Sequence, residues 1–171
     1  MALTEPDLTK VLSWPEFLKL DLPDPEDREY GEMYYDRAKK FLESHDVGVG
    51  IQESFLAMIY PHIMGMYLFK TENKNKFGEW FWVIVGDIPS ALFSSNVGHN
   101  PGMALDVYLG EMSMWVEAVY EGKPVDDLVP VNAPPTKEYA DMLLSRLKFI
   151  GENILMEEYK DDLGYDPDAV E

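Results

Sequence analysis

Residues 78–90 read Gly-Glu-Trp-Phe-Trp-Val-Ile-Val-Gly-Asp-Ile-Pro-Ser, and this stretch decides the fold. Within it, every residue from Trp80 to Val85 is aromatic or β-branched, and such side chains fill a pleated, buried surface well. The run is too short for a stable helix, and the Gly-Asp-Ile-Pro turn ends it abruptly. Because both faces are apolar, we expect a central strand with helices covering it on both sides.

The segments before this strand predict its neighbours. Residues 63–70 read as a second strand, and the polar loop 72–76 between the two strands predicts an antiparallel hairpin. A two-stranded ribbon is only marginally stable by itself, so helices must supply the missing burial. We interpret the apolar segment 51–60, which ends at Pro61, as a short buried helix.

Helical patterns occupy most of the remaining chain. Residues 3–20 predict one or two short helical pieces with a break at Trp14, because Pro15 disfavours helical geometry in the residue before it. Asp24 and Pro25 form a capping signal for a long helix that reaches about residue 42. Two further helices are expected at about residues 101–121, with Gly122 as terminator, and at about 136–158.

These elements predict a helix-rich α+β fold. Four or more amphipathic helices should surround a small antiparallel sheet, with its hairpin at about residues 63–70 and 80–86. A chain of 171 residues fits one domain with a sizeable core, and we place it at residues 1–160. Residues 161–171 are expected to form an acidic, frayed tail.

The net charge bears on the partners. The chain has 32 acidic and 14 basic residues, giving −18 at pH 7, and residues 101–171 contain sixteen of the acids but only five of the bases. Such a charge repels phosphate backbones and anionic lipid surfaces, so we expect neither a nucleic-acid nor a membrane partner. A basic protein would be attracted. Solubility alone is the simpler explanation of the charge.

The remaining composition indicates a cytoplasmic protein. Without cysteine there can be no disulfide, thiol catalysis or thiolate metal site. The first residues lack the basic-then-apolar pattern of a secretory signal. The longest apolar region, residues 55–69, is too short and too interrupted to span a bilayer.

Sequence motifs for catalysis and metal binding are absent. The 3 histidines lie in separate segments without a His-Glu-x-x-His pattern, and neither a Gly-x-Ser-x-Gly elbow nor a phosphate-binding loop occurs. We therefore predict no catalytic residue, metal ion or cofactor. Ser90 as nucleophile with His99 as base remains a weak alternative, since only closeness in sequence suggests it.

Five residues are candidates for ligand binding: Asp87, Trp80, Trp82, His99 and Ser90. At the exit of the strand, the Asp87 carboxylate could act as a general base or orient a ligand. Capping of the following turn by its own carboxylate is the favoured role. Trp80 and Trp82 share one face of the strand and could line a pocket, although aromatic residues in a central strand more often belong to the core.

The run from Trp80 to Ser90, followed by a loop and a helix at 101–115, resembles an uncharacterised bacterial family, a domain of unknown function. That family has an aromatic strand ending in a Gly-Asp-Leu-Pro type of turn and then a helix rich in aromatic residues. The resemblance covers residues 60–120 and departs at Ser90-Ala91, where the family has Thr-Asp. It implies a small cytoplasmic bacterial domain without an agreed activity. In a weaker resemblance, the turn is similar to those of acidic immunity proteins from bacterial toxin systems.

We therefore expect a soluble bacterial protein that acts as a non-enzymatic, acidic protein-binding module, of immunity or adaptor type, for a basic partner. The alternative is a small-molecule enzyme or ligand binder with a pocket near Asp87. The sequence does not indicate an oligomeric state.

Overall fold

The computed structural model describes residues 5–47, 50–72 and 78–164. The chain divides into two compact units, residues 1–99 and residues 100–171. The first unit contains a five-stranded antiparallel sheet and the second is helical, so the predicted α+β class is confirmed. The expectation of one domain over residues 1–160 stays a prediction.

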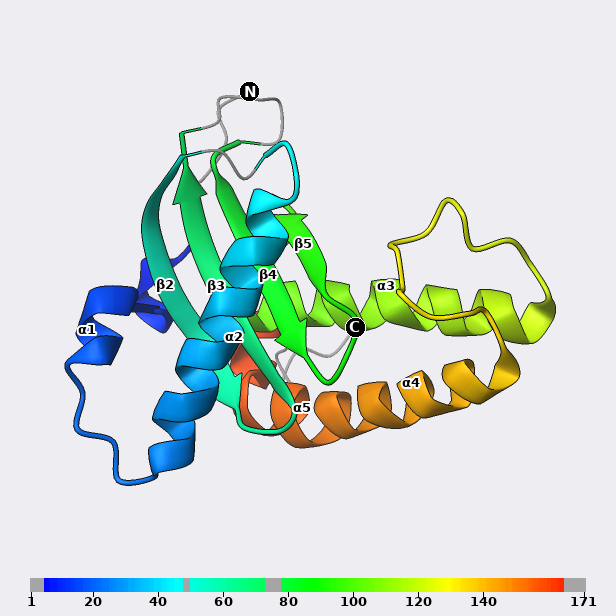
Figure 1. Ribbon diagram of the computed structural model, residues 1–171. Coiled ribbons are helices and arrows are strands. Elements are labelled where there is room, and N and C mark those ends of the chain that lie inside the picture. Colours follow the sequence, from blue (N-terminus) through cyan, green and yellow to red (C-terminus); the bar gives the residue numbers. More distant parts are fainter. Residues whose placement is uncertain (1–4, 48–49, 73–77, 165–171) are drawn as a thin grey trace. The chain divides into compact units, whose positions relative to one another are not determined.

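The first unit is built around the sheet, whose strands follow the order of the chain (Figure 1). The strands are β1 (Leu12–Ser13), β2 (Ile51–Tyr60), β3 (Met64–Thr71), β4 (Trp80–Gly86) and β5 (Ala91–Ser94). The helices of this unit are η1 (Leu8–Lys10), α1 (Trp14–Leu18) and α2 (Pro25–Glu43).

The predicted hairpin is confirmed by β3 and β4. They pair antiparallel from Met64 opposite Gly86 to Lys70 opposite Trp80. Every side chain from Trp80 to Val85 is buried, as expected of a central strand that is apolar on both faces.

The helix predicted at residues 51–60 is wrong, because this segment is the strand β2. Its pairing with β3 shifts register between Ile51 and Glu53 and again between Leu56 and Met58. Each bulge inserts one extra residue and breaks the alternation of apolar and polar side chains that identifies a strand. The apolar residues therefore lack the period of two in the sequence although the backbone is extended.

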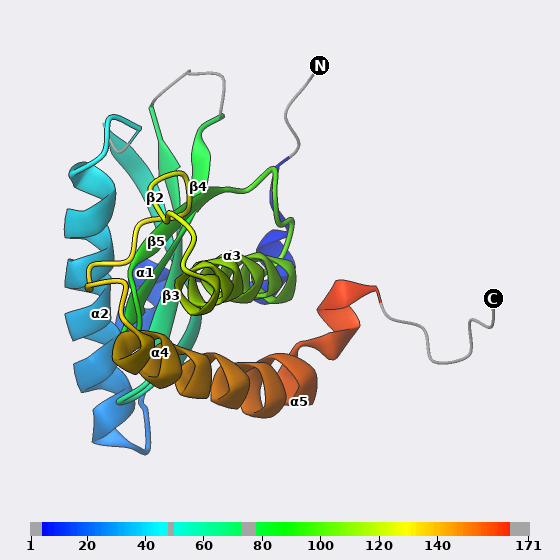
Figure 2. The ribbon, with the colours of Figure 1, turned by 90° about the vertical axis from the view of Figure 1, so that its right-hand side faces the viewer.

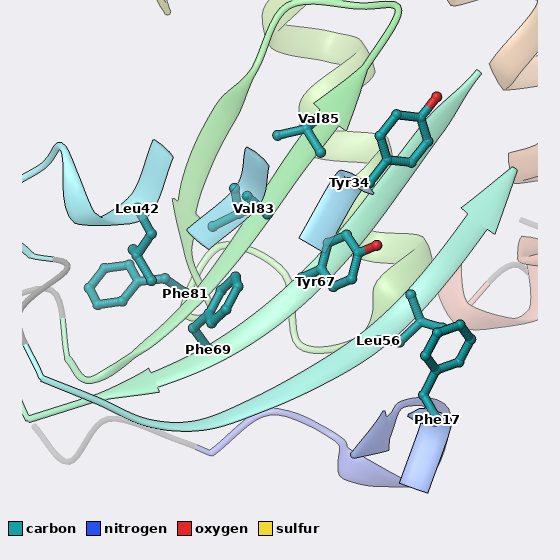
Figure 3. Close-up of a cluster of buried hydrophobic side chains, with 10 residues drawn as sticks. Phe17, Tyr34, Leu42, Leu56, Tyr67, Phe69, Phe81, Val83 and Val85 are labelled. Atoms are coloured by element: carbon teal, nitrogen blue, oxygen red, sulfur yellow. The ribbon is translucent and has the colours of Figure 1, made fainter. Parts of the chain in front are cut away.

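Helix α2 crosses one face of the sheet (Figure 1). Its start is capped as predicted, since the Asp24 carboxylate accepts the Glu26 N–H at 2.9 Å. Tyr34 and Leu42 of α2 belong to one buried cluster with side chains from β3 and β4 (Figure 3). The members from β3 and β4 are the odd-numbered residues Tyr67, Phe69, Phe81, Val83 and Val85, as the two-residue period of a strand requires, and Leu56 joins them from β2.

A close approach between elements also fixes α2. A Cβ placed on Gly31 would lie 2.7 Å from the Phe17 ring of α1 and 3.0 Å from Ile59 of β2. Any side chain at this position would push α2 away from its neighbours.

Near the N-terminus, the predicted break falls slightly earlier than expected: β1 separates η1 from α1, and Trp14 is the first residue of α1.

The second unit contains α3 (Pro101–Glu121), α4 (Lys137–Ile150), the π-helical segment η2 (Gly151–Leu155), α5 (Met156–Glu158) and η3 (Lys160–Leu163). Helices α3 and α4 lie side by side (Figure 2). As predicted, α3 ends where Gly122 adopts a left-handed conformation with φ of 70°. The predicted helix 136–158 is present, with one wide turn at η2.

The first residues of the predicted acidic tail lie against the start of α3. The Asp162 carboxylate accepts the Gly102 N–H at 3.1 Å, and the Asn100 side chain donates to the Asp162 carbonyl at 3.0 Å. A carboxylate at this helix end is favourable because the first N–H groups of a helix point outward unpaired. The rest of the predicted tail, 165–171, lies outside the described residues.

Candidate functional site

The two predicted tryptophans are core residues of the first unit. Trp82 is fully buried, and its Nε1 donates to the Gly98 carbonyl at 2.7 Å. Trp80 packs against Phe55 at 5.9 Å between ring centroids, and the Lys70 ammonium lies 5.5 Å from the Trp80 ring. Among the residues that the structure describes, the buried Trp80 Nε1 has no acceptor.

Trp80 is the first residue of β4, and Asp87 comes directly after its last residue, Gly86. The Asp87 side chain is exposed, and its backbone N–H donates to the Ile63 carbonyl at 2.9 Å. The preceding Gly86 has φ of 143°, and a Cβ there would lie 2.4 Å from the same carbonyl, so only glycine fits. The capping role of the Asp87 carboxylate stays a prediction.

Ser90 and His99 lie on either side of β5 in the chain. Ser90 is half-buried immediately before the strand, whereas His99 is exposed five residues after its last residue, Ser94. The His99 carbonyl accepts the Asp7 N–H at 2.9 Å, which ties the N-terminal segment to this loop. Of the five predicted residues, Trp82 and His99 are thus brought near each other through Gly98, while Asp87 and Ser90 border the turn between β4 and β5.

A polar cluster at the β2–β3 turn was not predicted. The Tyr30 hydroxyl lies 2.7 Å from His62 Nδ1, and His62 Nε2 lies 3.3 Å from the Glu26 carboxylate. His62 has φ of 70°, a conformation that residues other than glycine seldom adopt. Both ends of the ion pair are at least half exposed, at 63% for His62 and 50% for Glu26, so the pair contributes little stability. The cluster fastens the turn to α2.

A hollow of about 420 Å³ was also not predicted, and all its lining residues belong to the first unit. It opens where α1, α2 and β2 meet, and its walls include Trp14, Tyr35 and Phe55. Polar groups at the same hollow include Ser54 and Lys39. None of the five predicted residues lines it.

The exposed side of α3 is the third unpredicted feature. Met103 and Met114 are 37% and 49% exposed and lie three helical turns apart on one side of the helix. Gly110 lies between them, and a Cβ built on it would have no heavy atom within 4 Å. Asp106 and Glu117 are exposed beside these residues. We call these five residues the Met103–Met114 face.

Three buried tyrosines have pKa values above the ordinary value for tyrosine, because burial disfavours the charged phenolate. Burial raises the pKa of Tyr67 and of Tyr108 far above the ordinary value for tyrosine. Burial also raises the pKa of Tyr34, with further contributions from Tyr30 and Asp87, while Arg37 opposes the rise.

Within residues 5–47, 50–72 and 78–164, no three His, Asp or Glu side chains are grouped so that they could hold a metal ion. Over the same part of the chain, no helix has the length and apolar character needed to cross a membrane.

Comparison of this chain with protein-family models, curated proteins and solved structures found no match.

Proposed function

We propose that this chain is a non-enzymatic, acidic protein-binding module, of immunity or adaptor type, and that its partner is a basic protein. The observation that carries the proposal is the chemistry of α3. Its 21 residues include four carboxylates, Asp106, Glu111, Glu117 and Glu121, and neither lysine nor arginine. The neighbouring α4 has cations at Lys137, Arg146 and Lys148, so α3 is the better candidate for binding a basic surface.

The Met103–Met114 face adds apolar contact area to this charge. Methionine side chains are flexible and polarisable, so they adapt to partners of different shape. The bare backbone at Gly110 leaves room for a partner to approach the helix closely. A basic amphipathic helix fits this surface: its apolar side would cover the methionines, and its cations would meet Asp106 and Glu117.

The test uses two synthetic amphipathic peptides, one of lysine and leucine and the other with every lysine replaced by glutamate. The lysine peptide should bind the protein, and its affinity should fall as salt is raised, because exposed charges are screened. The glutamate peptide should not bind. Titration calorimetry at several salt concentrations measures both.

A charge-matched pair of variants separates docking on α3 from general attraction. Glu117→Lys and Glu32→Lys each change the net charge by the same amount at an exposed helix position. Only Glu117→Lys, on the Met103–Met114 face, should weaken binding of the lysine peptide by more than the change in net charge explains. Gly110→Trp should weaken it at every salt concentration, because the indole occupies the space left for the partner. Equal losses for both lysine variants would contradict docking on α3.

A further inference from the structure

The hollow at Trp14 is a second candidate binding site. It lies in the first unit, whereas α3 belongs to the second. Its volume of about 420 Å³ is within the range of small-molecule sites, roughly 300–1,000 Å³. Its lining combines aromatic walls with a few polar groups, as such sites usually do.

The aromatic rings of the wall are already stacked on one another. The Trp14 ring stacks on Tyr35 with centroids 4.0 Å apart and planes inclined by 7°, and it stacks on Phe17 at 5.0 Å. Trp14 and Tyr35 are nevertheless only half-buried, so part of each ring remains accessible. A ligand that packs against these rings would not have to order them first, which lowers the entropic cost of binding.

The polar groups on the α2 side of the hollow are donors. The Tyr35 hydroxyl donates to Ser54 Oγ at 3.0 Å, which leaves the Ser54 hydrogen available for another acceptor. Lys39 follows Tyr35 by one helical turn and lines the same hollow. Within the described part of the chain, Lys39 forms no ion pair with a carboxylate.

Glu53 also lines the hollow, but its carboxylate is engaged elsewhere. It lies 3.9 Å from the Lys70 ammonium, the residue paired with it across the two strands. Because Glu53 and Ser54 are successive residues of β2, their side chains point to opposite faces of the sheet. On the α2 side, the charge preference of the hollow is therefore determined by two donors, the Lys39 ammonium and the Ser54 hydroxyl.

We propose that the hollow at Trp14 binds a small organic carboxylate. The apolar body of this ligand packs against Trp14 and Tyr35, and its carboxylate accepts hydrogen bonds from Lys39 and Ser54. The site is independent of the binding of a basic protein by α3, so either proposal stands if the other fails.

The test uses phenylacetate and its neutral analogue phenylacetamide, which have nearly the same shape. The chemical shift of the Trp14 indole N–H, assigned by comparison with Trp14→Phe, reports binding. Phenylacetate should shift this signal saturably, with a dissociation constant on the order of millimolar for so small a ligand. Phenylacetamide should bind about fivefold more weakly, because it lacks the charge that Lys39 recognises.

Two adjacent lysines of α2 provide the matched variants. Lys39→Gln removes the cation at the hollow, whereas Lys40→Gln removes the next one, which does not line it. Lys39→Gln should weaken the binding of phenylacetate about fivefold and leave the binding of phenylacetamide unchanged. Lys40→Gln should affect neither ligand. Equal binding of the two ligands, equal effects of the two variants, or a Trp14 signal that does not saturate would overturn the proposal.

Discussion

The Tyr67 hydroxyl of β3 donates to the Gly31 carbonyl of α2 at 2.6 Å, and this bond is buried. It joins the sheet to the helix at the position where Gly31 permits their closest approach. The phenol thus supplies a directional contact between α2 and the sheet inside a largely apolar cluster.

Removing this hydroxyl should destabilise the protein by a small, measurable amount. Tyr67→Phe keeps the ring but loses the bond, and a typical intramolecular hydrogen bond contributes about 1 kcal/mol. The free energy of unfolding, from denaturant titration, should fall by that amount. Tyr139→Phe, at an exposed site, is the control and should leave it unchanged. A Tyr67→Phe protein as stable as the wild type would show that the bond adds nothing.

Alkaline conditions should weaken the fold. Burial raises the pKa of Tyr67 and Tyr108 in the native state, while tyrosine in an unfolded chain has a pKa of about 10. The stabilising contribution is therefore complete below about pH 10 and is lost as pH rises above it, because the unfolded chain releases protons that the native state retains. Each tyrosine adds a slope of about 1.4 kcal/mol per pH unit in that range. Unfolding curves on both sides of about pH 10 measure the slope.

The double variant Tyr67→Phe, Tyr108→Phe provides the control for this pH dependence. Its free energy of unfolding should fall less steeply above about pH 10, because two of the retained protons are gone. Equal slopes in the wild type and the double variant would mean that other groups cause the alkaline loss.

Two glycines of α3 should respond to alanine with opposite signs. Gly110→Ala should stabilise by about 0.5 to 1 kcal/mol, since alanine is the better helix former and the added methyl meets no neighbour. Gly102→Ala should destabilise, because its Cβ would lie 2.5 Å from the Asp162 Cβ and 3.0 Å from the Tyr159 carbonyl. Thermal and denaturant unfolding of both variants check the signs. The same sign for both would contradict the packing at the start of α3.

Asp87 offers a test between a structural and a ligand-binding role. If its carboxylate caps the turn after β4, Asp87→Ala should cost about 1–2 kcal/mol, as lost caps commonly do. Asp87→Asn keeps an acceptor and should cost less. A variant Asp87→Ala with unchanged unfolding energy would instead favour a ligand-binding role for this exposed carboxylate.

The parts of the fold that follow local rules could be predicted from the sequence. The run from Trp80 to Val85 predicts the central strand, because aromatic and β-branched residues favour a strand and the run is too short for a stable helix. Asp24 and Pro25 mark the start of α2, and Gly122 marks the end of α3, because each satisfies a backbone requirement at that point. The bulges in β2 could not be predicted, since they depend on pairing with β3.

The candidate sites depend on contacts between distant parts of the chain. Trp14, Tyr35 and Ser54 lie about twenty residues apart in sequence, and only the fold brings them to one hollow. His62 takes its unusual backbone conformation in a turn that sequence reasoning placed after a helix. The Met103–Met114 face had a signal in the sequence, namely two methionines and a glycine at helical spacing with no basic residue nearby.

The two bulges of β2 have a consequence for how molecules meet in concentrated solution. An outermost strand with a long straight row of free N–H and C=O groups would invite a second copy to extend it into a fibre. Here the outermost strand on one side, β1, spans only two residues and pairs with only Phe55 and Leu56 of β2. The rest of that edge of β2 is kinked by the bulges and carries the exposed charge of Glu53, and the opposite edge strand, β5, spans only four residues. Edge-to-edge pairing of copies into a continuous sheet is therefore disfavoured at both edges, and this protection does not depend on the buried core.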